Sequence, residues 1–168
     1  MSTLHRLTHR ALAAAIIAAT FAVGPGIFAP AAYAGVEINA DAEGIMLHGY
    51  DPVAYFAAGQ PMKGRSAYTV THMEGRYVFT SAANRDAFLK EPDKYAPQYG
   101  GYCAMGTALG KKLDGDPSQW KIVDGKLYLN VNADAAKAWN RDVPGNIAKA
   151  NANWPTIKDK PAAVLNKN

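Results

Sequence analysis

The segment WKIVDGKLYLNV (residues 120–131) carries the clearest local structural signal in the chain. Apolar and polar residues alternate on both sides of Asp124-Gly125, a pair favoured in the two-residue turn of a β-hairpin. Because successive side chains of a strand point to opposite faces, this register puts Leu127 and Leu129 on one face. The segment therefore predicts a tight antiparallel hairpin with one apolar face that the rest of the fold must cover.

A second hairpin is predicted for YTVTHMEGRYVFT (residues 68–80), with Glu74-Gly75 as its turn. That turn would pair His72 with Tyr77. His72 would then face the apolar side of the hairpin, where a histidine is more often a core residue than a metal ligand.

Short helices are expected around the hairpins, because polar capping residues precede several apolar segments. The expected helices cover residues 53–59, capped by Asp51; 82–90, capped by Ser81; 132–139; and 145–153, ending before Trp154-Pro155. The sequence shows no internal repeat and no regular alternation of strand and helix. Hairpins mixed with short helices predict a small single domain of the α+β class.

The first 34 residues have the pattern of a signal peptide. A basic start is followed by an apolar run over residues 11–28 and by Ala32-Tyr33-Ala34, which suits a cleavage site. Gly24-Pro25-Gly26 interrupts the run, so we expect cleavage rather than a membrane span. The sequence thus predicts export to the periplasm or the medium, a domain at 35–155 and a loosely held C-terminal tail at 156–168.

The charge balance argues against a nucleic-acid partner. The chain has 18 Lys and Arg residues against 14 Asp and Glu residues, a formal net charge of +4. Arg6 and Arg10 belong to the predicted leader, and without them 16 basic residues remain against 14 acidic ones. No basic cluster remains, so we expect neither nucleic-acid binding nor, after cleavage, membrane association.

Cys103 is the only cysteine of the chain, and it directly follows Gly100-Gly101-Tyr102. A lone cysteine in an exported protein suggests pairing between chains, a reactive thiol or a soft-metal ligand. A helix that starts near Gly101 would put Cys103 in its first turn, where free N–H groups lower a thiol pKa. The alternative is a small buried core residue, because free cysteines are often buried.

A metal ion bound by Cys103 would need further ligands, and the chain offers few. We expect His48, His72 and Met46 as candidates, with Met46 and His48 on the same face of an extended segment. Met105 is two residues from Cys103, so on a helix it points elsewhere. This ligand set suits a copper ion better than structural zinc, which takes four strong ligands. A homodimer would double the number of ligands.

A family resemblance rests on three segments: GYDPVAYF (49–56), YVFTSAANRDAFLKEPDKYAPQYGGYCA (77–104) and DPSQWKIVDGKLYLN (116–130). Together they resemble the exported, single-domain YHS domain proteins of bacteria, over most of residues 45–154. These domains are regarded as metal-binding modules related to treble-clef metal sensors. The resemblance therefore implies a treble-clef-like fold and a role for Cys103, although residues 77–81 hold no His or Cys ligand.

These observations favour a periplasmic or secreted module that binds a soft metal ion, preferably copper, through Cys103. The alternative is a metal-free module that binds an envelope protein, with Cys103 structural or redox-active. A thiol enzyme would need a histidine beside Cys103, oriented by Asp51 or Asp114, and no oxyanion-hole or cofactor pattern supports it. The many tyrosines near Cys103 suggest either core packing or a ligand pocket.

Overall fold

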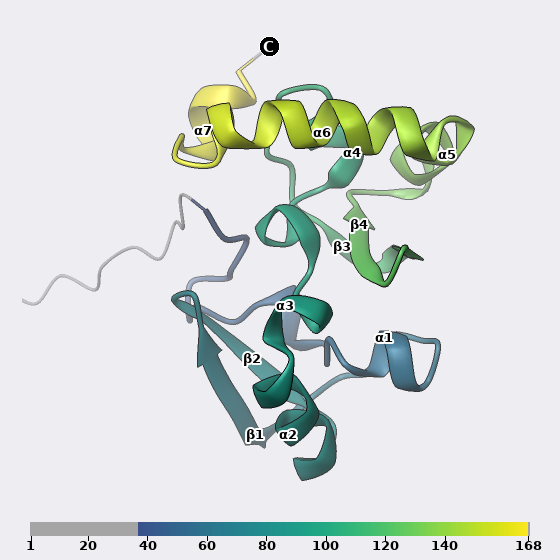
Figure 1. Cartoon of the computed structure of the whole chain (residues 1–168). Helices are drawn as coiled ribbons and strands as arrows, with labels where there is room; N and C mark the ends of the chain where they lie inside the picture. Colours follow the sequence, from purple (N-terminus) through teal and green to yellow (C-terminus); the bar gives the residue numbers. More distant parts are fainter. Residues whose placement is uncertain (1–36, 168) are drawn as a thin grey trace, which may run out of the picture. The chain divides into compact units, whose positions relative to one another are not determined.

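The computed structural model describes residues 37–167, in which two antiparallel β-hairpins stand out (Figure 1). The first joins β1 (Arg65–His72) to β2 (Gly75–Phe79), and the second joins β3 (Asp116–Val123) to β4 (Lys126–Asn130). Helices surround both hairpins, so the fold class is α+β, as predicted. The predicted leader, residues 1–34, lies outside the described residues.

The second hairpin has the predicted turn and register. Asp124 and Gly125 both have positive φ, and Ile122 pairs with Leu127. Leu127 and Leu129 are buried on one face of β4, and Tyr128 is buried on the other. β4 is therefore covered on both faces, although the alternating pattern predicts burial on one face only.

The first hairpin forms, but its turn is Met73-Glu74 rather than the predicted Glu74-Gly75. His72 therefore pairs with Gly75, not with Tyr77. Gly75 does not have a positive φ; instead, a Cβ atom there would lie 2.6 Å from Cγ of Met46. The glycine is needed for close packing against Met46, which is why it misleads a prediction based on turn preferences.

The expected helix starts at Ser81 and Asn132 are confirmed, whereas Asp51 caps the turn that leads into α1 (Ala54–Ala57), whose N-cap residue is Val53. Ser81 Oγ accepts a hydrogen bond from Asn84 N at 3.1 Å, and Asn132 Oδ1 accepts one from Ala135 N at 2.9 Å. Asp51 Oδ1 accepts one from Val53 N at 2.8 Å. The helices that follow Ser81 and Asn132 are α2 (Ala82–Lys90) and α5 (Ala133–Arg141).

The last long helix, α6 (Val143–Ile157), continues through Trp154-Pro155, where the sequence predicts its end. Pro155 leaves the carbonyl of Asn151 without its usual helical partner, and Asn151 is exposed to water. The segment after residue 155 is not a loose tail. It completes α6 and forms α7 (Ala162–Leu165), and the buried Lys112 donates hydrogen bonds from Nζ to backbone carbonyls of this segment.

The remaining elements are short: η1 (Leu47–Gly49), α3 (Pro92–Tyr95), η2 (Gln98–Gly101) and α4 (Ala104–Ala108). Within residues 37–167, every helix is too short or too polar to cross a membrane. The described residues all belong to one compact unit.

The two hairpins belong to two copies of the same structural unit. β1, β2 and α2 have the same lengths as β3, β4 and α5. Each element of the second set begins 51 residues after its counterpart, at residues 116, 126 and 133 instead of 65, 75 and 82. Both hairpins also have an irregularity near the start of their first strand. The N-cap residues of α2 and α5, Ser81 and Asn132, are also 51 residues apart.

The segments before the hairpins repeat as well. Three consecutive residues have positive φ at 47–49 and again at 99–101, which is 52 residues later. We call residues 45–95 the N-terminal repeat and residues 97–157 the C-terminal repeat. The expectation of no internal repeat is therefore wrong at the level of structure, because the copies keep backbone conformation while most matched side chains differ.

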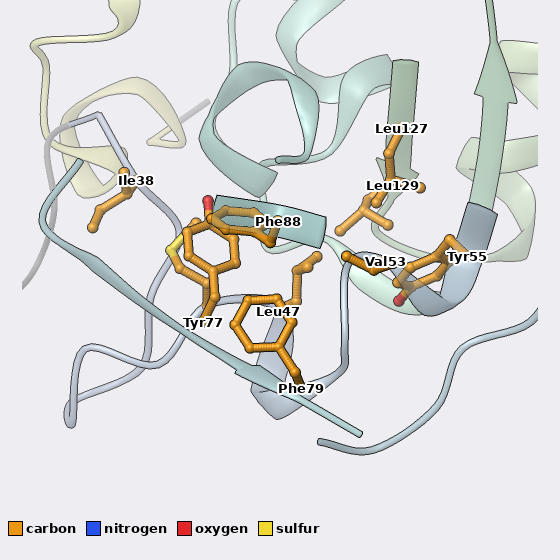
Figure 2. Close-up of a cluster of buried hydrophobic side chains, with 10 residues drawn as sticks. Ile38, Leu47, Val53, Tyr55, Tyr77, Phe79, Phe88, Leu127 and Leu129 are labelled. Atoms are coloured by element: carbon orange, nitrogen blue, oxygen red, sulfur yellow. The ribbon is translucent and has the colours of Figure 1, made fainter. Parts of the chain in front are cut away.

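Each repeat packs a pair of aromatic rings between its second strand and the following helix. Tyr77 and Phe88 have ring centroids 4.7 Å apart, and the matched pair Tyr128 and Trp139 has centroids 5.6 Å apart, both with an interplanar angle of 36°. Figure 2 shows the first pair inside a buried cluster that also includes Leu127 and Leu129 of the C-terminal repeat. The two repeats thus share one core cluster.

Candidate functional site

Cys103 is fully buried and is the N-cap residue of α4, not a residue of its first turn. Its Sγ accepts a hydrogen bond from Gly106 N at 3.2 Å, and the thiol donates to Asn130 Oδ1 at 3.7 Å. Burial raises the pKa of the thiol, and nearby backbone N–H groups lower it by less. The predicted low pKa is therefore wrong, because loss of hydration outweighs these donors.

Asp51 occupies in the N-terminal repeat the place that Cys103 occupies in the C-terminal repeat. Each residue precedes the first helix of its repeat. The buried Asp51 carboxylate accepts five hydrogen bonds, from the backbone of Val53, Ala54 and Thr80, the Thr80 hydroxyl and the Asn84 amide. Val131, which matches Thr80, likewise donates its backbone N–H to Cys103. Cys103 therefore takes the place of a capping carboxylate.

Met46 and His48 do not share a face. Met46 is fully buried and His48 is exposed, because the backbone between them adopts positive φ at Leu47 and His48 instead of an extended conformation. His48 Nε2 lies 2.9 Å from Oδ1 of Asp114. These two residues line a small surface hollow of about 220 Å³.

His72 faces the apolar side, as predicted, but its imidazole is not fully satisfied. Its ring lies 5.8 Å from the Phe88 ring, edge to face. Nε2 is buried and has no hydrogen-bond partner among the described residues; the nearby carboxylate oxygen of Asp93 is 3.9 Å away. That distance is too long for a hydrogen bond, so one polar atom of His72 is available.

The four predicted metal ligands do not form one site, because each of them contacts different residues. Cys103 contacts Asn130, His48 contacts Asp114, His72 packs on Phe88, and Met46 packs against Gly75. Within residues 37–167, no three His, Cys, Asp or Glu side chains come close enough together to hold a metal ion.

Most tyrosines near Cys103 belong to the core, and their hydroxyl groups are satisfied. Tyr55 donates to Pro117 O at 3.0 Å, and Tyr102 donates to Ile38 O at 3.0 Å. The carboxylates proposed for a thiol enzyme are also occupied. Asp51 accepts hydrogen bonds from the backbone of Val53 and Ala54, and Asp114 contacts His48 rather than the thiol of Cys103.

A cavity of about 520 Å³ lies beside the β1–β2 turn. We call it the turn cavity. It is lined by Glu37, Ile38, His72, Met73, Glu74, Tyr77, Ala96, Pro97, Gly100 and Trp154. Its residues come from both repeats, from Ala96 between them and from the segment before the first repeat, and His72 is the one predicted site residue among them.

The turn at the mouth of this cavity has an unusual composition. Met73 and Glu74 both adopt positive φ, 46° and 66°, a region that favours Gly, Asn and Asp. The matched turn of the C-terminal repeat has Asp124-Gly125, which suits the same conformation. The Met-Glu pair in a tight turn is thus a sequence signal that could have pointed to this cavity.

Comparison with family models, with curated proteins and with solved structures finds no match to this chain.

Proposed function

We propose that the protein is a binding module that takes a small ligand in the turn cavity, and that Cys103 is part of the framework of the C-terminal repeat. The observation that carries this proposal is the turn Met73-Glu74, which lines a cavity of about 520 Å³ with two residues in the left-handed region. A cavity of this size suits a small organic ligand.

The cost of this turn supports a functional role for its side chains. A non-glycine residue other than Asn or Asp in the left-handed region costs about 1–2 kcal/mol. Proteins retain such local strain where the side chains serve binding or catalysis. The C-terminal repeat avoids the cost with Asp124-Gly125, so the hairpin itself does not require Met73 and Glu74.

A titration followed by amide NMR tests the proposal. A panel of small aromatic and aliphatic compounds, with positive, negative or no charge, is added to the labelled protein. At least one compound should shift the signals of Ile38, His72 and Trp154. Ala96→Phe, which fills the cavity, should abolish the shifts, whereas Ala83→Phe on the exposed face of α2 should keep them. Shifts confined to other residues, or unchanged binding by folded Ala96→Phe, would contradict the proposal.

Soft-metal binding is a second candidate, favoured by the Gly-Gly-Tyr-Cys-Ala segment that resembles the YHS domain proteins. A copper ion would require Sγ of Cys103 to leave its contacts with Gly106 and Asn130. Competition against a Cu(I) chelator tests this: Cys103→Ser should abolish stoichiometric binding, and His48→Ala should weaken it. Wild-type Cu(I) affinity in Cys103→Ser would rule out this candidate.

Export to the periplasm or the medium is part of both candidates. Mass spectrometry of the protein recovered from cells tests it, with Gly35 as the expected first residue of the mature chain.

A further inference from the structure

We infer that the ligand of the turn cavity is an organic cation: an apolar or aromatic body that carries an amine. This inference rests on the proposed function and specifies its ligand class. It is carried by the charge of the lining residues, by the aromatic side chains among them and by the flexible side chain at the mouth.

The lining has the opposite charge to the chain as a whole. The chain has a formal net charge of +4, whereas the turn cavity is lined by Glu37 and Glu74 and, within residues 37–167, by no Lys or Arg. A cavity with carboxylates and low-dielectric walls attracts cations and disfavours anions. The lining therefore selects a positively charged ligand.

The two carboxylates differ in how available they are. Glu37 forms an ion pair with Lys158, which also contacts Asp159, so part of its charge is already compensated. Glu74 is exposed and has no ion pair with another residue of the described part of the chain. Glu74 is therefore the carboxylate that a ligand ammonium group would meet.

Aromatic and apolar side chains of the lining would contact the apolar body of the ligand. Trp154 and Tyr77 line the cavity together with Ile38. The Trp154 ring is held by neighbouring tyrosines, with the Tyr99 ring centroid 5.8 Å away. The ammonium of Lys112 already lies 5.8 Å from the centroid of the Trp154 ring, so Trp154 offers its apolar surface to the ligand body and leaves the charged group to Glu74.

Two further lining residues help to accommodate such a ligand. Met73 is 65% exposed, and its flexible thioether side chain can adapt to the shape of the ligand body. Nε2 of His72, which lines the cavity and has no hydrogen-bond partner among the described residues, offers a further polar contact. Met73 and Glu74 would both be lost if the turn had the Asp-Gly composition of the C-terminal repeat.

Three probes of similar shape test the charge preference: phenethylamine, 2-phenylethanol and 3-phenylpropionate, each titrated into the protein by NMR. The amine should bind about three- to fivefold more tightly than the alcohol, because it adds one ion pair with Glu74. The carboxylate should bind most weakly. Added salt should reduce the affinity of the amine and leave that of the alcohol unchanged.

Glu74→Gln should weaken phenethylamine binding about three- to fivefold and should not affect the alcohol. Asp124→Asn changes the charge of the matched turn in the other hairpin and should leave both affinities unchanged. Equal affinities of amine and alcohol, or an unchanged amine affinity in Glu74→Gln, would overturn the cation inference while the cavity still binds ligands. Failure of all three probes and of the wider panel to bind in the cavity would overturn the proposed function as well.

Discussion

The two repeats place different chemical groups at the same point of the same backbone arrangement. In the N-terminal repeat the Asp51 carboxylate caps the turn that leads into α1 and accepts five hydrogen bonds. In the C-terminal repeat the Cys103 thiol accepts a hydrogen bond from Gly106 N and has a raised pKa. The comparison shows that a lone cysteine after two glycines does not need a chemical role to explain its position, since a cap is required there in both repeats.

The turns of the two hairpins also differ, and here the N-terminal repeat has the residues that are less suited to the backbone conformation. At Asp124-Gly125 the C-terminal repeat has residues that suit the left-handed conformation, and nothing about this turn calls for a further explanation. At Met73-Glu74 the N-terminal repeat has residues that oppose it, next to the turn cavity. The unfavourable choice at one of two equivalent positions distinguishes a functional turn from a structural one.

The largest expected effect concerns the cap of the N-terminal repeat. Asp51→Ala removes the acceptor for five hydrogen bonds, among them those from the buried backbone of Val53 and Ala54 and from the partly buried backbone N–H of Thr80. We expect a loss of about 3–5 kcal/mol in the free energy of unfolding, measured by urea denaturation. Asp51→Asn, which keeps the shape and one acceptor oxygen, should lose less. A loss below about 1 kcal/mol in Asp51→Ala would mean that the two caps are not comparable.

The cap of the C-terminal repeat should give a smaller loss. Cys103→Ala removes a buried sulfur and the acceptor for Gly106 N, so we expect a loss of about 1–3 kcal/mol in the same measurement. Cys103→Ser keeps an acceptor at the cap and should be the more stable of the two variants. If Cys103 were only a core residue, the order would reverse, because a buried serine hydroxyl costs more than alanine.

The sequence predicts the parts of this fold whose signals are local. The caps at Ser81, Asn132 and Asp51 and the turn at Asp124-Gly125 each depend on a few adjacent residues, so preferences for turns and caps suffice. The register of the first hairpin depends on Gly75 packing against Met46, which lies far away in the sequence. The same holds for the pKa of Cys103, since burial by distant residues sets it.

The candidate site is less predictable than the fold. The predicted ligand pair Met46 and His48 fails because two positive φ angles turn His48 to the surface. The turn cavity joins Glu37, His72 and Trp154, which no spacing rule connects. The repeat is hard to see in the sequence because few matched positions are identical, as Tyr77 and Tyr128 are, while most differ or keep only a common size, as Phe88 and Trp139 do.

An alkaline pH titration sharpens the comparison of the caps. The pKa of Cys103 is raised in the folded state above the ordinary thiol value of 9.0. Its neutral form is therefore favoured by folding, and this contribution is complete below pH 9 and is lost as the pH rises above it. Wild type should lose stability relative to Cys103→Ser as the pH rises above the ordinary thiol value of 9.0. Buried tyrosines such as Tyr55 and Tyr77, whose pKa values are also raised, affect both proteins equally. If the stabilities of wild type and Cys103→Ser change in parallel with pH, the thiol has the same pKa in the folded and unfolded states.

The smallest expected effect comes from exchanging the turns. Met73→Asn with Glu74→Gly gives the N-terminal repeat a favourable turn, and we expect a gain of about 1 kcal/mol in the free energy of unfolding. Asp124→Met with Gly125→Glu should lose about the same amount, because it creates the same backbone strain in the other hairpin. The first double variant should also bind phenethylamine more weakly, whereas the second should bind it like wild type. If Met73→Asn with Glu74→Gly gains no stability, the wild-type turn at Met73-Glu74 is not strained. The two turns would then differ in sequence but not in energy.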